Sequence, residues 1–521
     1  MSRTSASAPS TDAGPTEGVA RWVGAFALSL ATFMSVLDIS IANVSIPAIA
    51  GDLGVSPNQG TWIVTSFGVA TAVSMPLTGW MVQRLGTVRL FALSVLLFTT
   101  MSFLCGAAPT IETLVAFRVL QGVVAGPMIP LCQALLLRSF PPDRAGSALS
   151  LLALTAFAAP VAGPLLGGWL TDNWSWRWIF HVNVPVGVAC AIAVWQIYRP
   201  LETATRRAPI DATGLMLLVA WVGSLQLMLD LGKDHDWFGS PVIVALAFCA
   251  IACFALFLAW ESTDANPIID LSLFRLRNFW VGTLAISLAY GLFLGNLVLL
   301  PLWLLQYMDY SATLAGVVLA PMGVLAIVVM PFVGRYLDRH DPRWMISAAF
   351  LTFAFSLWMR SRFSTDADLV SLLLPSFVQG AGSAMFFTPL LAKILSQVPP
   401  HRVASASGLS NFLRYTGGAV GTSLLTTAWE WRAVFHRSRL IERLSDGYEP
   451  LVQARIALET AGLPAAMQWA TIERWVDRQA HTLAVTEMFY GSAVTFVGLV
   501  AVIWMGKRAA KRTVPLLGEA T

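Results

Sequence analysis

The chain carries one motif twice, as Pro141-Pro142-Asp143-Arg144-Ala145-Gly146-Ser147-Ala148 and, 258 residues later, as Pro399-Pro400-His401-Arg402-Val403-Ala404-Ser405-Ala406. Further pairs keep nearly the same offset. At 258 residues, Gln121-Gly122 recurs as Gln379-Gly380 and Gly163 as Gly421. At 255 residues, Met75-Pro76 recurs as Met330-Pro331, and Gly79 with Arg84 as Gly334 with Arg339. Because the register is kept at several places, the chain is expected to contain two copies of one structural unit.

The composition places both copies in a membrane. Apolar residues make up 56% of the 521 residues and charged residues 12%, about half the usual share of a soluble domain. All five cysteines lie inside apolar runs, so no disulfide framework is expected. Residues 1–21 are mostly small and polar and are expected to form a disordered tail. They do not resemble a signal peptide, because the apolar run that follows is too long.

Apolar runs long enough to cross a bilayer as helices, about 20 residues each, occur fourteen times. We expect membrane spans at 22–46, 60–82, 88–108, 112–137, 146–170, 177–198, 212–231, 240–260, 279–306, 313–337, 343–360, 369–395, 403–430 and 487–506.

The basic residues predict the orientation of these spans. With the N-terminus inside, 20 of the 33 Lys and Arg lie on the cytoplasmic side. The short outer loops hold four of them (Arg177, Lys233, Arg360 and Arg362), and the long segment 431–486 holds seven. Long loops count little in the positive-inside rule, so both termini are expected to be cytoplasmic.

Parallel six-helix repeats predict an all-α major facilitator fold, with two six-helix bundles and two inserted helices. The expected division is a cytoplasmic tail at 1–21, an N-terminal bundle at 22–198, an inserted pair with its loops at 199–278, a C-terminal bundle at 279–506 that includes a periplasmic loop at 431–486, and a cytoplasmic tail at 507–521. The loop is charged and long enough for two amphipathic helices.

Several motifs resemble those of the fourteen-helix drug/proton antiporters of the EmrB/QacA type, across nearly the whole chain. They are Leu37-Asp38-Ile39-Ser40-Ile41-Ala42-Asn43-Val44-Ser45-Ile46-Pro47, Gly79-Trp80-Met81-Val82-Gln83-Arg84-Leu85-Gly86 with Arg89, Arg118-Val119-Leu120-Gln121-Gly122, Ala162-Gly163-Pro164-Leu165-Leu166-Gly167-Gly168, and Trp176-Arg177-Trp178-Ile179-Phe180 followed by Asn183 and Pro185. One position departs from the pattern: Gln83 stands where the superfamily usually has Asp. The charge-relay role of that acid is therefore not expected here, although Asp338 beside Arg339 keeps it in the second copy.

Asp38 is the leading candidate for proton coupling. An acid within a span usually faces a cavity or a partner and is functional. From the helical rise, Asp38 lies about 24 Å from the cytoplasmic entry, and Arg118 lies about 9 Å below the outer surface, which is a similar depth. We expect Arg118 to pair with Asp38 in one conformational state and so to couple proton loading to conformation. The alternative is a permanent structural ion pair.

Polar and aromatic side chains on several spans are expected to line a substrate cavity. Those on the first and fourth spans are small or polar, and those on span nine could stack on planar hydrophobic ligands. Arg414 could instead satisfy carbonyl groups between the bundles. The expected cavity residues are Ser35, Ala42, Gln121, Tyr290, Phe293, Asn296, Asn411, Arg414 and Tyr415.

A third set is expected to serve conformational change, through tight turns with cationic anchors and through close helix packing at a hinge or seal between the halves. Plain topology or packing is the alternative for each. The set comprises Gly79, Arg84, Gly86, Arg89, Gly163, Pro164, Gly167, Gly168, Asp338 and Arg339.

No enzyme chemistry is indicated. The six histidines are scattered, so neither a metal site nor any other cofactor is expected, and no phosphate-binding lysine loop is present. The energy source is therefore expected to be an ion gradient, with the proton as first choice and sodium left open. The basic residues follow topology, so no nucleic-acid partner is expected.

We therefore expect proton-coupled multidrug efflux of hydrophobic or amphipathic compounds by alternating access. The alternatives are a dedicated exporter of one metabolite class, such as a fatty acid or siderophore, and a facilitator-type importer. The resemblance implies a bacterial inner membrane, with a periplasmic adaptor protein and an outer-membrane channel as partners.

Overall fold

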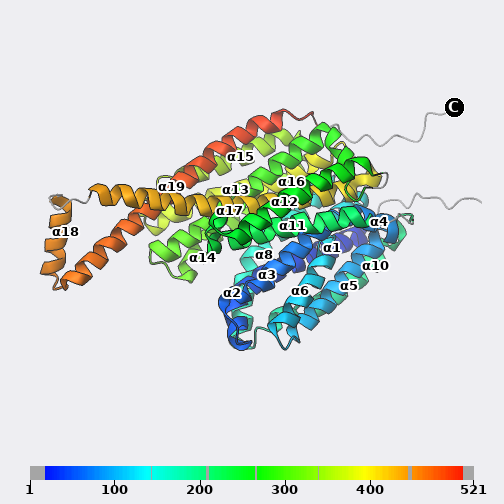
Figure 1. The fold of residues 1–521 in the computed structure, drawn as a ribbon. Helices are drawn as coiled ribbons and strands as arrows, with labels where there is room; N and C mark the ends of the chain where they lie inside the picture. Colours follow the sequence, from blue (N-terminus) through cyan, green and yellow to red (C-terminus); the bar gives the residue numbers. More distant parts are fainter. Residues whose placement is uncertain are drawn as a thin grey trace, which may run out of the picture.

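The computed structural model describes residues 18–141, 144–206, 211–264, 267–337, 339–443 and 449–508, and these form helices joined by turns and loops (Figure 1). The first group of helices, called the N-terminal bundle below, consists of α1 (Gly18–Asp52), α2 (Pro57–Gly60), α3 (Trp62–Ser74), α4 (Thr78–Leu85), α5 (Thr87–Gly106), α6 (Ile111–Ala125), α7 (Met128–Ser139), α8 (Ala145–Asn173), α9 (Trp178–His181) and α10 (Asn183–Tyr198).

Two helices with short 3₁₀ turns around them follow: η2 (Arg199–Leu201), α11 (Ala212–Leu231), η3 (Gly232–His235), η4 (Trp237–Gly239), α12 (Pro241–Thr263) and η5 (Leu271–Arg275). The C-terminal bundle consists of α13 (Arg277–Tyr307), α14 (Ala312–Leu337), α15 (Pro342–Arg360), α16 (Leu369–Leu395), η6 (Pro400–Arg402), α17 (Val403–Arg443), α18 (Glu449–Thr460) and α19 (Ala465–Trp504). The pair α11 and α12 packs together and contacts both α3 and α17.

Each of the fourteen expected spans coincides with one or two of these helices. Among the described residues, ten helices are long and apolar enough to cross a membrane, or eleven when α3 and α4 count as one broken span. That span bends by 65° between α3 and α4, where Pro76 removes a backbone donor. The three expected spans outside this count lie on α8, α15 and α17, which pack among the other helices.

The two bundles meet at one end of the molecule. We call it the basic end; it holds Arg84, Arg89, Arg144, Arg343, Arg402 and Lys507, and the opposite end, near α18, is the distal end (Figure 1). A Cβ added to Gly79 would lie 2.9 Å from the Ser405 Cβ, and one added to Gly334 would lie 2.9 Å from the Ser147 Cα. These are two copies of one contact, since both glycines and both serines belong to the sequence repeat.

Core packing agrees with contact at the basic end. One hydrophobic cluster combines residues of the C-terminal bundle with residues of the N-terminal bundle, namely Ala72, Met75, Ala134, Leu149 and Ala153. A separate cluster toward the distal end, which includes Leu37, Ile63 and Phe180, draws its described members from the N-terminal bundle alone. The bundles are therefore packed together at the basic end and separately toward the distal end.

Gly163 and Gly421, a second pair of residues related by the sequence repeat, allow two helices to approach closely inside each bundle. Gly163 on α8 lies directly against Ser40 on α1, and Gly421 on α17 lies directly against Gly291 on α13. Glycine permits this approach because it has no Cβ. The expectation that Gly163 and Gly167 seal the two halves against each other is therefore wrong, because both contact α1 of their own bundle.

Segment 431–486 differs from the expected loop. Its charged residues continue the membrane helices: α17 runs 41 residues and α19 runs 40 residues, about 60 Å each, and short α18 lies between their far ends (Figure 1). Ion pairs hold the two extensions together. Arg432 donates to both Glu487 carboxylate oxygens, at 2.6 and 2.9 Å, and Arg437 pairs with Asp477 and Glu473.

Candidate functional site

Asp38 on α1 and Arg118 on α6 form an ion pair inside the N-terminal bundle. The Arg118 side chain has no exposed surface and that of Asp38 has 1%. The guanidinium Nη1 of Arg118 donates to a carboxylate oxygen of Asp38. A carboxylate and a guanidinium buried in this way each stabilise the other's charged form, and removing one leaves an uncompensated charge.

Two side-chain amides complete the surroundings of the Asp38 carboxylate. Asn183, at the start of α10, donates to Asp38 at 2.9 Å, and Gln121 on α6 lies 3.4 Å from the same oxygen. Gln121 also accepts a hydrogen bond from Arg118 at 2.8 Å. Asn183 donates in addition to Ser102 at 3.0 Å. The acid on α1 is thus held by donors from α6 and α10.

Arg118 is bound on its other side by backbone and by an aromatic ring. Its Nε donates to the Ile63 carbonyl at 3.0 Å, and its guanidinium lies 4.3 Å from the centre of the Phe67 ring. Nη2 has no hydrogen-bond partner among the described residues. Arg118 would therefore keep contacts to α3 if Asp38 were neutralised.

The remaining N-terminal cavity candidates are packed rather than open. Ser35 is 5% exposed and bonds to the Thr32 carbonyl of its own helix, and Ala42 is fully buried. Gly163 contacts α1 two residues beyond Asp38. The face of α1 that carries the acid is therefore covered by its own bundle in this conformation.

A second buried cation lies in the C-terminal bundle near the basic end. Arg414 on α17 is 4% exposed, and its Nη2 donates to Asn411 at 2.9 Å. Three aromatic rings surround the guanidinium, with ring centres 4.6, 4.5 and 4.8 Å from it for Tyr290, Tyr415 and Phe387. Cation–π contacts of this kind stabilise a charge that is removed from water.

The two bundles are joined next to this cluster by a pair of amides. Asn411 on α17 donates to Gln133 on α7 at 2.9 Å, and both side chains are buried. Gln133 Nε2 has no partner among the described residues. Gln133 was not predicted as a site residue, although a glutamine within an apolar span is the signal that could have identified it.

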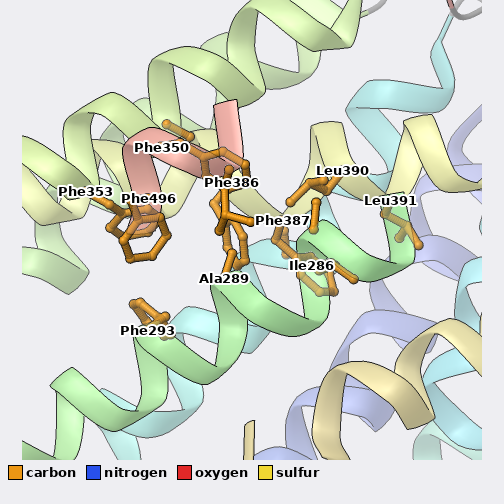
Figure 2. Close-up of a cluster of buried hydrophobic side chains, with 14 of the residues drawn as sticks. Ile286, Ala289, Phe293, Phe350, Phe353, Phe386, Phe387, Leu390, Leu391 and Phe496 are labelled. Carbon is orange, nitrogen blue, oxygen red and sulfur yellow. The ribbon is translucent and has the colours of Figure 1, made fainter. Parts of the chain in front are cut away.

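Two cavity candidates of span nine are packed inside the C-terminal bundle, although Phe293 also stacks on Tyr290, with ring centres 6.2 Å apart, and so borders the Arg414 cluster. Figure 2 shows Phe293 facing an aromatic cluster with Phe353, Phe386 and Phe496, and the Phe293 ring centre lies 5.8 Å from that of Phe353. Asn296 is 1% exposed and donates to Ser492 on α19 at 3.0 Å. Both therefore belong to the packed interior of the C-terminal bundle in this conformation.

The turn between α4 and α5 is held by an acid from elsewhere in the chain. Gly86 has φ of +85°, and its missing Cβ leaves room for Glu202. The Glu202 carboxylate accepts hydrogen bonds from the backbone N–H groups of Val88 and Arg89, at 3.0 and 2.8 Å, so it caps α5. In this chain Glu202 thus supplies a carboxylate to the turn in which Gln83 replaces the usual acid.

The other conformational candidates are more scattered. Arg84 is exposed and lies over the Trp80 ring, Arg339 is exposed, and Gly168 faces open space. Pro164 lies within α8 and nothing is described of its side chain, and Asp338 lies outside the described residues. Asn183, Ser102 and Glu202 were missed as site residues. Asn183 was part of a quoted motif, but its role depends on the packing of α10 against α1 and α5, which the sequence does not give.

Comparisons with known proteins agree with this architecture. Residues 28–422 match the family model described as Major Facilitator Superfamily. The chain is 46% identical over 495 residues to the multidrug export protein EmrB of Haemophilus influenzae, covering 95% of this chain and 97% of that protein. It is 43% identical over 497 residues to the fatty acid resistance protein FarB of Neisseria gonorrhoeae, covering 95% and 98%.

Among solved structures, the proton:xylose symporter XylE superposes with a TM-score of 0.58 at 13% sequence identity, covering 95% of this chain and 97% of that one. This likeness concerns the fold alone. Together with the family model and the identity to EmrB, it identifies the chain as a multi-pass membrane protein that belongs to the major facilitator superfamily, in the branch of the EmrB multidrug export proteins.

Proposed function

We propose that this chain exports hydrophobic or amphipathic compounds across the bacterial inner membrane in exchange for protons, by alternating access between the two bundles. The observation that carries the proposal is the buried contact between Asp38 and Arg118, with Asn183 and Gln121 as further donors. An acid buried inside a transporter and held by a cation and neutral amides is suited to bind and release a proton.

The proposed coupling follows from the contacts. A proton on Asp38 cancels the attraction to Arg118, which then rests on the Ile63 carbonyl and the Phe67 ring of α3. Loss of the ion pair loosens α1 from α6, and α1 is packed along α8. Because α8 contacts α14 of the other bundle at Ser147 and Gly334, a change at Asp38 can reach the contact between the bundles.

The substrate is proposed to bind between the bundles, beside Arg414, Tyr290 and Tyr415. Rings flanking a cation offer a surface for planar hydrophobic compounds. The relatives named as multidrug export proteins support broad specificity. FarB, a fatty acid resistance protein, supports the second candidate, a dedicated exporter of one metabolite class. A transport panel that mixes cationic, neutral and anionic amphiphiles separates the two, and the direction of proton movement separates both from an importer.

Both termini are proposed to be cytoplasmic, so the paired extensions of α17 and α19 stand on the periplasmic side. They carry exposed apolar side chains beyond the membrane, including Trp431, Phe435 and Trp475, at 67%, 40% and 48% exposure. We assign this extension to contact with a periplasmic adaptor protein, through which the substrate would pass to an outer-membrane channel.

The proposal is tested by adding substrates to inside-out vesicles that hold a pH gradient. The wild type is expected to dissipate the gradient when a substrate is added, and Asp38→Asn is expected not to. Asn173→Ala, at an exposed asparagine of α8, serves as a matched control and should behave like the wild type. If Asp38→Asn dissipates the gradient as fast as the wild type does, Asp38 is not the coupling acid.

A further inference from the structure

The C-terminal bundle buries a guanidinium that meets no counter-charge among the residues that the structure describes. Arg360 is the last residue of α15, and its side chain turns into the bundle and is 0% exposed. Its Nη2 donates to Ser376 on α16 at 3.1 Å. Nε and Nη1 have no hydrogen-bond partner among the described residues, and no ion pair joins Arg360 to a described acid. The residue was expected in a short outer loop, where its charge would meet water.

The neighbouring helices cannot supply the missing charge. Helices α13, α14, α15 and α16 contain no Asp or Glu. Glu487 on α19 is already held by Arg432 and by His436, the latter at 3.0 Å. The α15 C-terminus contributes only the partial negative charge of its carbonyl groups. The Phe489 ring centre lies 6.0 Å from the guanidinium and offsets part of its charge. A buried cation without a carboxylate partner is still strongly unfavourable, and an anion from outside the chain would neutralise it.

The sequence repeat shows how this differs from the N-terminal bundle. The offset of 255 places Arg360 at the position of Cys105, and the offset of 258 places Ser376 at the position of Arg118. Each bundle thus has one buried arginine between its third and fourth spans. In the N-terminal bundle the fourth span supplies it (Arg118), and in the C-terminal bundle the third span supplies it (Arg360). In the N-terminal bundle the arginine meets Asp38, whereas in the C-terminal bundle no carboxylate meets it.

Further unsatisfied polar groups lie on the face of α16 that Arg360 contacts. Ser376, Gln379 and Ser383 share this face by helical spacing. Gln379 Oε1 and Ser383 Oγ are buried without a partner among the described residues. An anion held by Nε and Nη1 of Arg360 would lie nearest to Gln379, one turn beyond Ser376, whose amide oxygen and nitrogen are interchangeable by a flip. Ser383 lies about 10 Å beyond Ser376 along α16 and is not among the proposed ligands.

We propose that Arg360, together with Gln379 one turn beyond Ser376 on α16, binds a monovalent inorganic anion of the size of chloride as a resident ligand of the C-terminal bundle. The anion takes the place that Asp38 occupies for Arg118, and it neutralises the buried charge. Arg360 lies at the distal end of α15, so the anion enters from that end. Stability of the purified protein then depends on the anion in the buffer.

The first test measures the melting temperature of the purified full-length protein in sodium chloride and in sodium gluconate at equal ionic strength. We expect a saturable rise of several degrees in chloride for the wild type, no rise for Arg360→Met, and an unchanged rise for Arg362→Met, whose arginine is exposed two residues away. If the wild type melts at the same temperature in both salts, or if Arg360→Met keeps the rise in chloride, the proposal is wrong.

A second test does not depend on a variant. Crystals of the wild type grown in bromide are expected to show an anomalous scattering peak beside the Arg360 guanidinium. If other bromide sites in the same crystal are fully occupied and this peak is missing, the proposal is wrong. Repeating the melting measurement with a medium-chain carboxylate in place of chloride tests whether an organic anion, and not an inorganic one, supplies the negative charge. If it stabilises the protein through Arg360 and chloride does not, the site belongs to a transported substrate.

Discussion

Gly79 on α4 lies so close to Ser405 on α17 that an added Cβ would come within 2.9 Å of the Ser405 Cβ. The contact joins the two bundles at the basic end, and its repeat partner joins Gly334 to Ser147. A side chain at position 79 would require the Ser405 side chain to turn away and the backbone of α17 to move back by a few tenths of an ångström, because the Ser405 Cα is also only 3.2 Å away.

Gly79→Ala is therefore expected to destabilise the conformation that is closed at the basic end. Overpacking of a close contact typically costs about 1–3 kcal/mol, which corresponds to a shift in the conformational equilibrium of about fivefold to a hundredfold. The expected result is faster labelling of a cysteine placed at the basic end and a lower rate of transport. Gly168→Ala, where the added Cβ meets open space, is the matched control. Equal labelling of the two variants would contradict this prediction.

Asn183 is expected to be a positioning residue for proton coupling. It donates to Asp38 at 2.9 Å from a third helix. A hydrogen bond to a charged group contributes about 1.5–3 kcal/mol, so Asn183→Ala should lower the rate of proton-coupled export about tenfold or more. Binding of substrate, followed by tryptophan fluorescence, should change little. A variant that transports at the wild-type rate would show that Arg118 alone positions the acid.

The repeat allowed much of the fold to be predicted, because its positions are those where helices approach most closely. Gly79 with Ser405, Gly334 with Ser147, and Gly421 with Gly291 are all contacts of repeat residues. The pairing of Asp38 with Arg118 could be predicted as well, because the helical rise alone places both residues at a similar depth in the membrane.

Side-chain direction was less predictable. Phe293 is as suitable for a cavity as for a core, and only the packing of α15, α16 and α19 around it decides between them (Figure 2). Arg360 ends a span, where arginine usually reaches water, and nothing in the sequence indicates that its side chain turns inward. The extensions of α17 and α19 depend on ion pairs between segments about 40 to 55 residues apart, such as Arg437 with Asp477 and Arg432 with Glu487.

Asp341 should make stability depend on pH at the basic end. It begins α15, accepts from the Arg343 backbone N–H at 3.1 Å and pairs with the Arg343 guanidinium at 2.9 Å. Burial favours the neutral acid, but the hydrogen bonds and charge of Arg343 outweigh it and hold the pKa of Asp341 below its usual value. Because the pKa is lowered in the folded state, this stabilisation is complete above the pKa of the unfolded chain and is lost as the pH falls through the lower folded value.

Asp341→Ala is accordingly expected to be less stable than the wild type by about 1 kcal/mol at neutral pH, the usual effect of losing a helix N-cap. As the pH falls below about 4, the ordinary pKa of a carboxyl group, the difference should begin to shrink, and the two proteins should converge only below the lowered pKa of the folded state. Thermal unfolding in detergent between pH 3 and pH 8 measures this. A difference that stays constant over the whole range would mean that the charge of Asp341 contributes nothing.

The ring of Tyr290 is expected to matter more than its hydroxyl. The Arg414 guanidinium lies 4.6 Å from the centre of that ring. Tyr290→Phe keeps the cation–π contact and should bind substrate like the wild type, whereas Tyr290→Leu removes it at a cost of about 0.5–2 kcal/mol. Titration with a fluorescent amphiphile should show weakening of about twofold to thirtyfold for the leucine variant only. Equal weakening in both variants would assign the effect to the hydroxyl group.

The hydrogen bond from Asn411 to Gln133 should stabilise the closed basic end, because it is a direct side-chain bond between the bundles. Asn411→Ala and Gln133→Ala should each speed labelling of a cysteine at that end. The double variant should be no faster than the stronger single one, since both remove the same bond, with a coupling of about 1 kcal/mol. Asn411 also contacts Arg414, so Gln133→Ala is the cleaner single variant. If the two effects add in full, the amides act independently and the bond does not hold the bundles together.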